Sequence, residues 1–233
     1  SEQIGQMSVY LLRVIRDLRT ELPTNISLQS FGLPLVEPLH QRLASEVSAK
    51  PVQIFSKSCT RKKVPGRALW EGNPELPVQP SPGTFKLLHS LALAMAKAGG
   101  DLWSPAALAG LKRNLRKTVA AKWGEVLNAK AEVNGTTNGE VSTDGQEAVD
   151  GEEKSATLEV AAEKNDDVLI QTLFDVLLLQ SAFEVQGADA DELVKFGEIV
   201  DGKIELDSVA KKRVFSAAKE YWKRTALLFG LLA

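Results

Sequence analysis

The chain has 233 residues, of which 44% are hydrophobic and 25% are charged, and its net charge at pH 7 is −2. This length can bury a core in one extended or two small domains, while the near-neutral charge excludes a global attraction to nucleic acid or anionic membrane. The single cysteine, Cys59, excludes an internal disulfide framework and suits a reducing compartment.

Residues 1–48 are predicted to form a pair of helices. The first helix carries an apolar stripe at helical spacing and ends at Pro23; the stripe consists of Ile4, Met7, Leu11, Ile15, Leu18 and Leu22. The second helix is shorter, and Pro34 and Pro38 are both tolerable in its first turn. Its apolar positions are Leu35, Leu39, Leu43 and Val47.

Residues 49–81 interrupt this periodicity. Proline and glycine recur throughout the segment, and Lys57, Arg61, Lys62 and Lys63 make it basic. Such breakers end helices because proline lacks an N–H donor and glycine is conformationally free. The segment is therefore predicted to be a proline-rich basic linker or a loop that straps the bundle.

Residues 82–233 are predicted to form a C-terminal helical bundle. Ser81-Pro82 starts one helix, which Gly99 ends, and Ser104-Pro105 starts the next, because Ser caps and Pro suits the first helical position. The apolar face of the first is Phe85, Leu88, Ala92 and Met95. The stripe of the second is Leu108, Leu111, Leu115, Val119, Trp123 and Val126. The short connection predicts that these two helices are antiparallel neighbours.

An acidic, glycine-punctuated stretch at residues 132–162 interrupts this bundle. It contains few large aliphatic residues, so we predict that it is a disordered insert. An apolar helix is expected over residues 168–183 and a short one over 189–196. The apolar helix is also too polar and too short to cross a bilayer.

The last helix is expected from Asp207, a capping residue, to the end of the chain. Its predicted seam alternates spacings of four and three through Val214, Ala218, Tyr221, Thr225, Leu228 and Leu232. The whole pattern predicts an all-α fold, an elongated bundle of about six or seven helices.

No catalytic or metal-binding constellation is recognisable. His40 and His89 are far apart and do not form a cluster, and no glycine-rich loop has the context of a phosphate site. Cys59 lies among basic residues that could lower its pKa, but no base accompanies it. We therefore predict a protein without enzymatic activity and without metal or other cofactor.

Two kinds of interaction surface are candidates. The first is the last helix, because aromatic and arginine side chains often anchor protein interfaces. Its candidate partner-binding residues are Tyr221, Trp222, Arg224, Thr225, Leu228, Phe229 and Leu231. The alternative is a basic patch for lipid or phosphate, formed by Lys112, Arg113, Arg116 and Lys117. Nucleic acid is not expected, since stacking aromatics and a reading helix are not evident.

The order of these features resembles a known family. Leu76-Pro77-Val78-Gln79-Pro80-Ser81, Ala98-Gly99-Gly100, Val119-Ala120-Ala121, the leucine-rich stretch 169–179 and residues 224–231 are similar to the C-terminal part of subunit 1 of the conserved oligomeric Golgi complex. The resemblance covers roughly residues 76–129 and 165–231, with residues 224–231 the strongest part.

This resemblance implies a helical-rod tethering subunit that captures vesicles in intra-Golgi retrograde transport. It implies a connector that binds other subunits, above all subunit 8 and also those of lobe A, with SNAREs and Rab GTPases reached through the whole complex. The location implied is the cytoplasmic face of the Golgi, with peripheral membrane association. A subunit of a related rod-like tether, such as the exocyst, remains an alternative.

Overall fold

The computed structural model describes residues 2–21, 33–59, 70–99, 102–135, 152–185 and 192–231. These residues form seven α-helices and one short β-hairpin, which confirms the predicted all-α fold. The helices are α1 (Glu2–Glu21), α2 (Leu33–Cys59), α3 (Pro82–Ala98), α4 (Pro105–Gly135), α5 (Glu152–Ala182), α6 (Glu192–Asp201) and α7 (Ser208–Phe229). The hairpin strands are β1 (Trp70–Glu71) and β2 (Leu76–Pro77).

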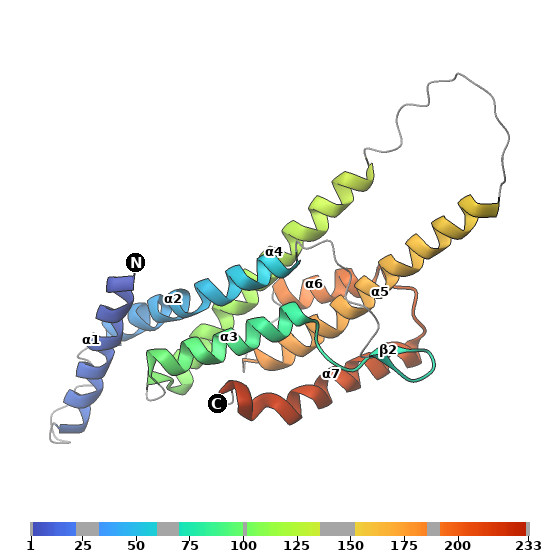
Figure 1. Cartoon of the computed structure of the whole chain (residues 1–233). Coiled ribbons are helices and arrows are strands. Elements are labelled where there is room, and N and C mark those ends of the chain that lie inside the picture. The colour runs from blue at the N-terminus through green and yellow to red at the C-terminus, as the bar shows by residue number, and fades with distance from the viewer. Residues whose placement is uncertain are drawn as a thin grey trace.

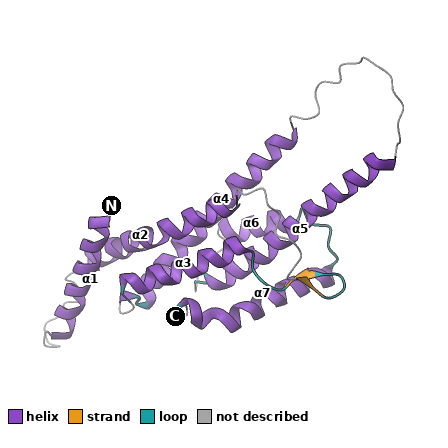
Figure 2. Cartoon of the chain, viewed as in Figure 1, coloured by secondary structure: helices purple, strands orange, loops and turns teal. Residues whose placement is uncertain are grey.

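The helices pack as two groups of three. In the first group α2 lies along both α3 and α4, which run antiparallel to each other (Figure 1). In the second, α5 packs against α6 and α7. Contacts of α4 with α6 and of α3 with α7 join the groups, and α1 packs on α2 at one end. Figure 2 shows how small a part the hairpin forms of this helical body.

Helix α4 displays the predicted apolar stripe. Its buried positions include Leu108, Leu111, Leu115, Val119 and Trp123. In α3 the buried face is instead Thr84, Leu87, Leu88, Leu91 and Met95. Phe85, expected on the apolar face, is 45% exposed, so the buried face is rotated from the predicted one.

Helix α1 presents much of its predicted stripe to solvent. Met7, Leu11 and Leu18 are all exposed, whereas Ser8 and Leu12 are buried. Because α1 packs on α2 through this other side, its apolar stripe is an exposed surface of the described chain.

The predicted linker boundary at residue 49 is wrong, because α2 continues as a helix through Pro51 to Cys59. A proline inside a helix removes one backbone hydrogen bond and costs about 3 kcal/mol. Burial offsets this cost, since Val47, Pro51 and Phe55 face the core at successive spacings of four. Phe55 contacts Trp123 of α4 edge-on, with ring centroids 5.0 Å apart, and Trp123 stacks on Phe196 of α6 at 5.4 Å.

The rest of the predicted linker contains the hairpin, which straps the bundle as the alternative interpretation expected. Trp70 pairs with Pro77 and Glu71 with Leu76 in an antiparallel register. The indole Nε1 of Trp70 donates to Oε1 of Gln171 at 3.2 Å, which fastens the hairpin to α5. Residues 60–69 lie outside the described residues.

The insert predicted at 132–162 is helical at both of its described ends. Helix α4 extends to Gly135, and α5 begins at Glu152. Both helices project beyond the packed body in Figure 1. The predicted disorder is thus wrong for residues 132–135 and 152–162, while the stretch 136–151 lies outside the described residues. The few aliphatic residues here misled the prediction, because a helix can continue from a packed segment without burying a core of its own.

A buried carboxylate joins α5 to the start of α3. Asp175 is 4% exposed and accepts hydrogen bonds from the backbone N–H of Ser81 and the hydroxyl of Thr84, both at 2.9 Å. The amide Nε2 of Gln171 donates to it at 3.3 Å and also donates to the carbonyl of Gln79 at 3.0 Å. Ser81 is the N-cap of α3, so Asp175 fixes the first turn of that helix.

Burial raises the pKa of Asp175 from 3.8 to about 6, against the opposing effect of its hydrogen bonds to Ser81, Thr84 and Gln171. The folded chain therefore binds this proton more tightly than the unfolded chain does. The contribution of Asp175 to the free energy of unfolding is greatest below pH 3.8 and is lost as the pH rises through 6.

Comparing the wild-type chain with Asp175→Asn isolates this effect, because the other titrating groups are common to both. We expect the free energy of unfolding of the wild type minus that of the variant to fall by about 2 kcal/mol between pH 4 and pH 7. Urea denaturation followed by circular dichroism at several pH values measures it. A difference that does not change with pH would contradict the assignment.

The aromatic cluster of α2, α4 and α6 gives a second prediction. Replacing the buried Phe55 by alanine is expected to lower the free energy of unfolding by about 3 to 5 kcal/mol, because a large cavity is left between three helices. The matched control is Phe215→Ala, whose side chain is exposed on α7 and should cost under about 1 kcal/mol. Equal effects of the two changes in urea denaturation would refute the continuation of α2 through Pro51 into the core.

Candidate interaction surface on the last helix

Helix α7 begins and ends with recognisable caps. The carboxylate of Asp207 accepts a hydrogen bond from the backbone N–H of Ala210 at 2.6 Å, which confirms the predicted capping residue. At the other end Gly230 adopts a left-handed conformation with φ of 62°, which glycine enters at little cost.

The buried seam of α7 differs from the predicted one. It recurs every four residues through Ala210, Val214, Ala218, Trp222 and Ala226, and Phe229 completes it. A strict spacing of four follows a ridge inclined by about 26° to the helix axis, so the contact line crosses the helix obliquely. Accordingly α7 packs along α5 and reaches α3 with its end, where Phe229 contacts Phe85.

Three of the predicted partner-binding residues pack inside the chain and are not exposed to a partner. Trp222, Phe229 and Leu231 are buried. Trp222 stacks on Phe229 with centroids 6.2 Å apart, and Phe229 meets Phe85 at 6.3 Å. The prediction that these three side chains contact a partner is thus corrected, because all three are buried within the chain, and the Trp222–Phe229 pair reaches α3 through Phe85.

Tyr221 and Thr225 are half-buried on α7, and Tyr221 faces α5. The Tyr221 ring lies edge-on to Phe174 at 6.5 Å, and burial raises the pKa of its hydroxyl. The Thr225 hydroxyl donates to the carbonyl of Tyr221 at 2.8 Å. Tyr221 therefore packs against α5, the hydrogen bond of Thr225 stays within α7, and both residues offer only part of their surface to a partner.

Two exposed leucines lie side by side in the last turn of α7, whereas Val209 and Phe215 are isolated exposed apolar side chains nearer its start. Leu228, a predicted contact, is 75% exposed, and Leu227, which the sequence reasoning missed, is 84% exposed. Arg224 is also exposed and pairs with Glu220 at 3.1 Å. Leu227 is visible in the sequence as a second leucine beside Leu228. It lies off the predicted seam, and the seam pattern therefore does not predict it.

The predicted basic patch on α4 is not a patch. Lys112 and Arg116 are buried, and Arg113 and Lys117 alone are exposed. Burial lowers the pKa of Lys112, while the nearby charge of Glu184 partly opposes that shift. The spacing of the four residues could not show which of them are buried. The two buried cations, Lys112 and Arg116, each come one residue after a leucine of the apolar stripe of α4.

Arg116 has a structural partner at the end of α5. Its Nη1 donates to the carbonyl of Phe183 at 3.1 Å and to that of Gln180 at 3.3 Å. The last carbonyls of a helix lack intrahelical donors and carry partial negative charge, so a cation there is stabilising. The predicted lipid or phosphate contact of Arg116 is therefore corrected, because its guanidinium caps the C-terminal end of α5.

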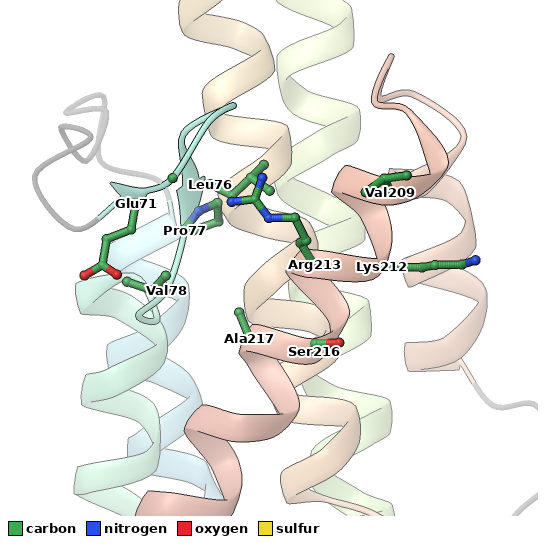
Figure 3. A pocket seen from close by; sticks show the side chains of 10 residues that line it. Glu71, Leu76, Pro77, Val78, Val209, Lys212, Arg213, Ser216 and Ala217 are labelled. Carbon is green, nitrogen blue, oxygen red and sulfur yellow. The ribbon is translucent and has the colours of Figure 1, made fainter.

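A surface pocket of about 500 Å³ separates the hairpin from the first half of α7 (Figure 3). Its walls include Leu76, Pro77 and Val209, and Arg213 reaches across it from α7, whereas Lys212 points away. The Nη1 of Arg213 donates to the carbonyl of Asn73 at 3.0 Å. Arg213 therefore ties the hairpin turn to α7.

A second pocket of about 380 Å³ lies between α5, α6 and α7. Leu173 and Leu177 contribute apolar surface, and the exposed Phe215 forms one wall. Lys211 bridges α7 to α6 through Asp201, with nitrogen and carboxylate oxygen 2.9 Å apart. This pocket is thus framed by residues that hold the three helices together.

Within the described part of the chain, no group of three or more His, Cys, Asp and Glu is placed to hold a metal ion. None of the described helices is long and apolar enough to span a bilayer. Comparisons with protein-family models, with curated proteins and with solved structures each gave no match.

The position of Arg116 gives a prediction with controls on the same helix. Arg116→Ala removes two hydrogen bonds from a charged donor and is expected to lower the free energy of unfolding by about 2 to 3 kcal/mol. Arg113→Ala and Lys117→Ala, at exposed positions, should each change it by less than about 0.5 kcal/mol. Urea denaturation of the three variants measures these changes in the free energy of unfolding. An Arg116→Ala chain as stable as the two controls would contradict the capping role of Arg116.

Proposed function

We propose that this chain is a non-enzymatic domain of a vesicle-tethering complex and connects subunits of that complex through the exposed end of α7. The observation that carries the proposal is the exposure of Leu227 and Leu228 on a helix whose opposite side is fully packed. Large apolar side chains gain free energy when they leave water, about 25 cal/mol for each Å² buried. Two adjacent leucines in such a position favour a protein partner.

The resemblance noted in the sequence supports the choice of complex. It covers α3, most of α4, the apolar part of α5, and the last two helices, which together make up most of the packed body. On this basis the proposed complex is the conserved oligomeric Golgi complex, which acts in intra-Golgi retrograde transport at the cytoplasmic face of the Golgi. The proposed partner is its subunit 8, with lobe A subunits, SNAREs and Rab GTPases reached through the assembled complex.

The alternative, lipid or phosphate binding through the basic patch of α4, has less support. Two of the four residues invoked, Lys112 and Arg116, are buried, and Arg116 donates to carbonyls of the α5 end. A surface left with two exposed cations contributes little attraction at physiological salt.

The connector proposal is tested with the paired change Leu227→Asp and Leu228→Asp. The wild-type chain is expected to capture purified subunit 8 at both low and high salt, because an apolar contact is not screened. The double variant should weaken this capture by about tenfold or more, since each leucine would be replaced by a hydrated charge. Capture is measured as the dissociation constant in a pull-down titration.

The matched control is Val209→Asp, which places the same charge on an exposed apolar position in the first turn of α7. Circular dichroism should show both variants folded, because none of the altered side chains is buried. Capture of subunit 8 by the double variant with wild-type affinity, or absence of capture by the wild type, would refute the proposal.

A further inference from the structure

Residues 70–81, which we call the strap, comprise the hairpin and the short segment that leads from it into α3. The strands of the hairpin are two residues long, and β2 packs on both α5 and α7. Within the strap, the buried residues are Leu76, Pro77 and Pro80, and most of the others are exposed. A short hairpin with so little buried surface is marginally stable by itself, so the strap depends on its attachments to the helices.

Two of these attachments hold the hairpin. The indole Nε1 of Trp70 donates to Oε1 of Gln171 at 3.2 Å, and Nε2 of the same glutamine donates to the carbonyl of Gln79 at 3.0 Å. At the tip, Nη1 of Arg213 donates to the carbonyl of Asn73 at 3.0 Å (Figure 3). The hairpin is therefore fastened to α5 at its stem and to α7 at its tip.

The third attachment is the carboxylate of Asp175, where the strap ends. Ser81 is both the last residue of the strap and the N-cap of α3, and its backbone N–H donates to Oδ1 of Asp175 at 2.9 Å. Separation of the strap from α5 would remove this donor and admit water to the carboxyl. The strap therefore controls whether Asp175 is buried or hydrated.

The closed strap can hold Asp175 with or without a proton. In the ionised state, Oδ2 accepts the hydroxyl proton of Thr84 at 2.9 Å. In the protonated state, Oδ2 donates to Thr84 across the same distance, and the Thr84 hydroxyl turns toward Oγ of Ser81, 3.3 Å away. A hydroxyl both donates and accepts, so the proton is accommodated without movement of the heavier atoms.

The groups that form hydrogen bonds with Asp175 are uncharged: Ser81 and Thr84 at the start of α3, and Gln171 on α5. Helix α7 also packs on α5, and there it presents the phenol of Tyr221 to the residue before Asp175. The charged side chains of the strap and of the first turn of α3 are exposed, namely Glu71, Glu75 and Lys86. Burial is accordingly the main cause that raises the pKa of Asp175 from 3.8 to about 6.

We infer that the strap opens from α5 and α7 as a unit while the helices stay folded, and that its opening is coupled to the release of a proton from Asp175. This device is separate from the proposed connector surface, because the strap meets the first half of α7 and the two exposed leucines lie at its other end.

The direction of the coupling follows from where the proton is bound more tightly. The pKa of Asp175 is about 6 in the closed strap, and in an open strap the hydrated carboxyl returns to about 3.8. Opening therefore becomes easier as the pH rises from 3.8 through 6 and changes little above that window. The strap is closed most firmly in acidic solution.

Hydrogen exchange of the whole chain, followed by mass spectrometry, tests the inference. Peptides covering residues 70–84 report the strap, and peptides covering residues 108–123 report the buried part of α4. The strap amides are expected to exchange faster than those of α4 at every pH, because only the strap opens locally. After correction for the intrinsic pH dependence of exchange, protection of the strap should fall about tenfold between pH 5 and pH 7.5.

Three variants assign this fall to its cause. Asp175→Asn places an amide where the protonated acid would donate to Thr84, so protection of the strap should be the same at both pH values. The matched control is Asp207→Asn, the same change at the exposed cap of α7, which should keep the tenfold fall. Arg213→Ala detaches the tip and should lower protection at both pH values without removing the fall.

Two results in the wild-type chain alone would overturn the inference. Equal protection of the strap and of α4 at each pH would mean that the strap opens only when the whole fold does. Protection of the strap that does not change between pH 5 and pH 7.5 would remove the coupling to a proton. A fall of the same size in the Asp175→Asn chain, shown by circular dichroism to be folded, would refute Asp175 as the group responsible.

Discussion

A carboxylate buried in α5 organises the centre of this fold. Asp175 accepts hydrogen bonds from the first turn of α3, and Gln171, one turn earlier on α5, holds the segment that leads from the hairpin into α3. Placing an anion in the interior is costly, and here a capping residue, a hydroxyl and an amide offset part of that cost. The start of α3 is thereby fixed on α5.

Aromatic contacts join the two three-helix groups, α2 with α3 and α4, and α5 with α6 and α7. Trp123 lies between Phe55 of α2 and Phe196 of α6, while Phe229 of α7 reaches Phe85 of α3. These contacts occur at separate places along the body, so the groups are held at more than one point. The two halves of the body are therefore fixed relative to each other.

The sequence predicted the all-α class and the stripe of α4 because periodicity reports local geometry directly. It failed where tertiary contacts decide: Pro51 stays helical because its neighbours Val47 and Phe55 are buried, and Arg116 is buried because the end of α5 offers it two carbonyls. The seam of α7 shows the same limit. A seam that repeats every four residues and one that alternates four and three are both compatible with a helix. Only the crossing angle with the neighbouring helices selects between the two.

The guanidinium of Arg116 also has a consequence for the uniqueness of the native packing. A slip of α4 by one residue would turn this side chain by about 100° and shift it by about 1.5 Å, which would leave the two carbonyls of α5 without a donor and a cation stranded in the interior. Leucine stripes tolerate small displacements, since one methyl group substitutes for another. A directional, charged contact does not, and it makes alternative alignments of α4 on α5 energetically distinct from the native one.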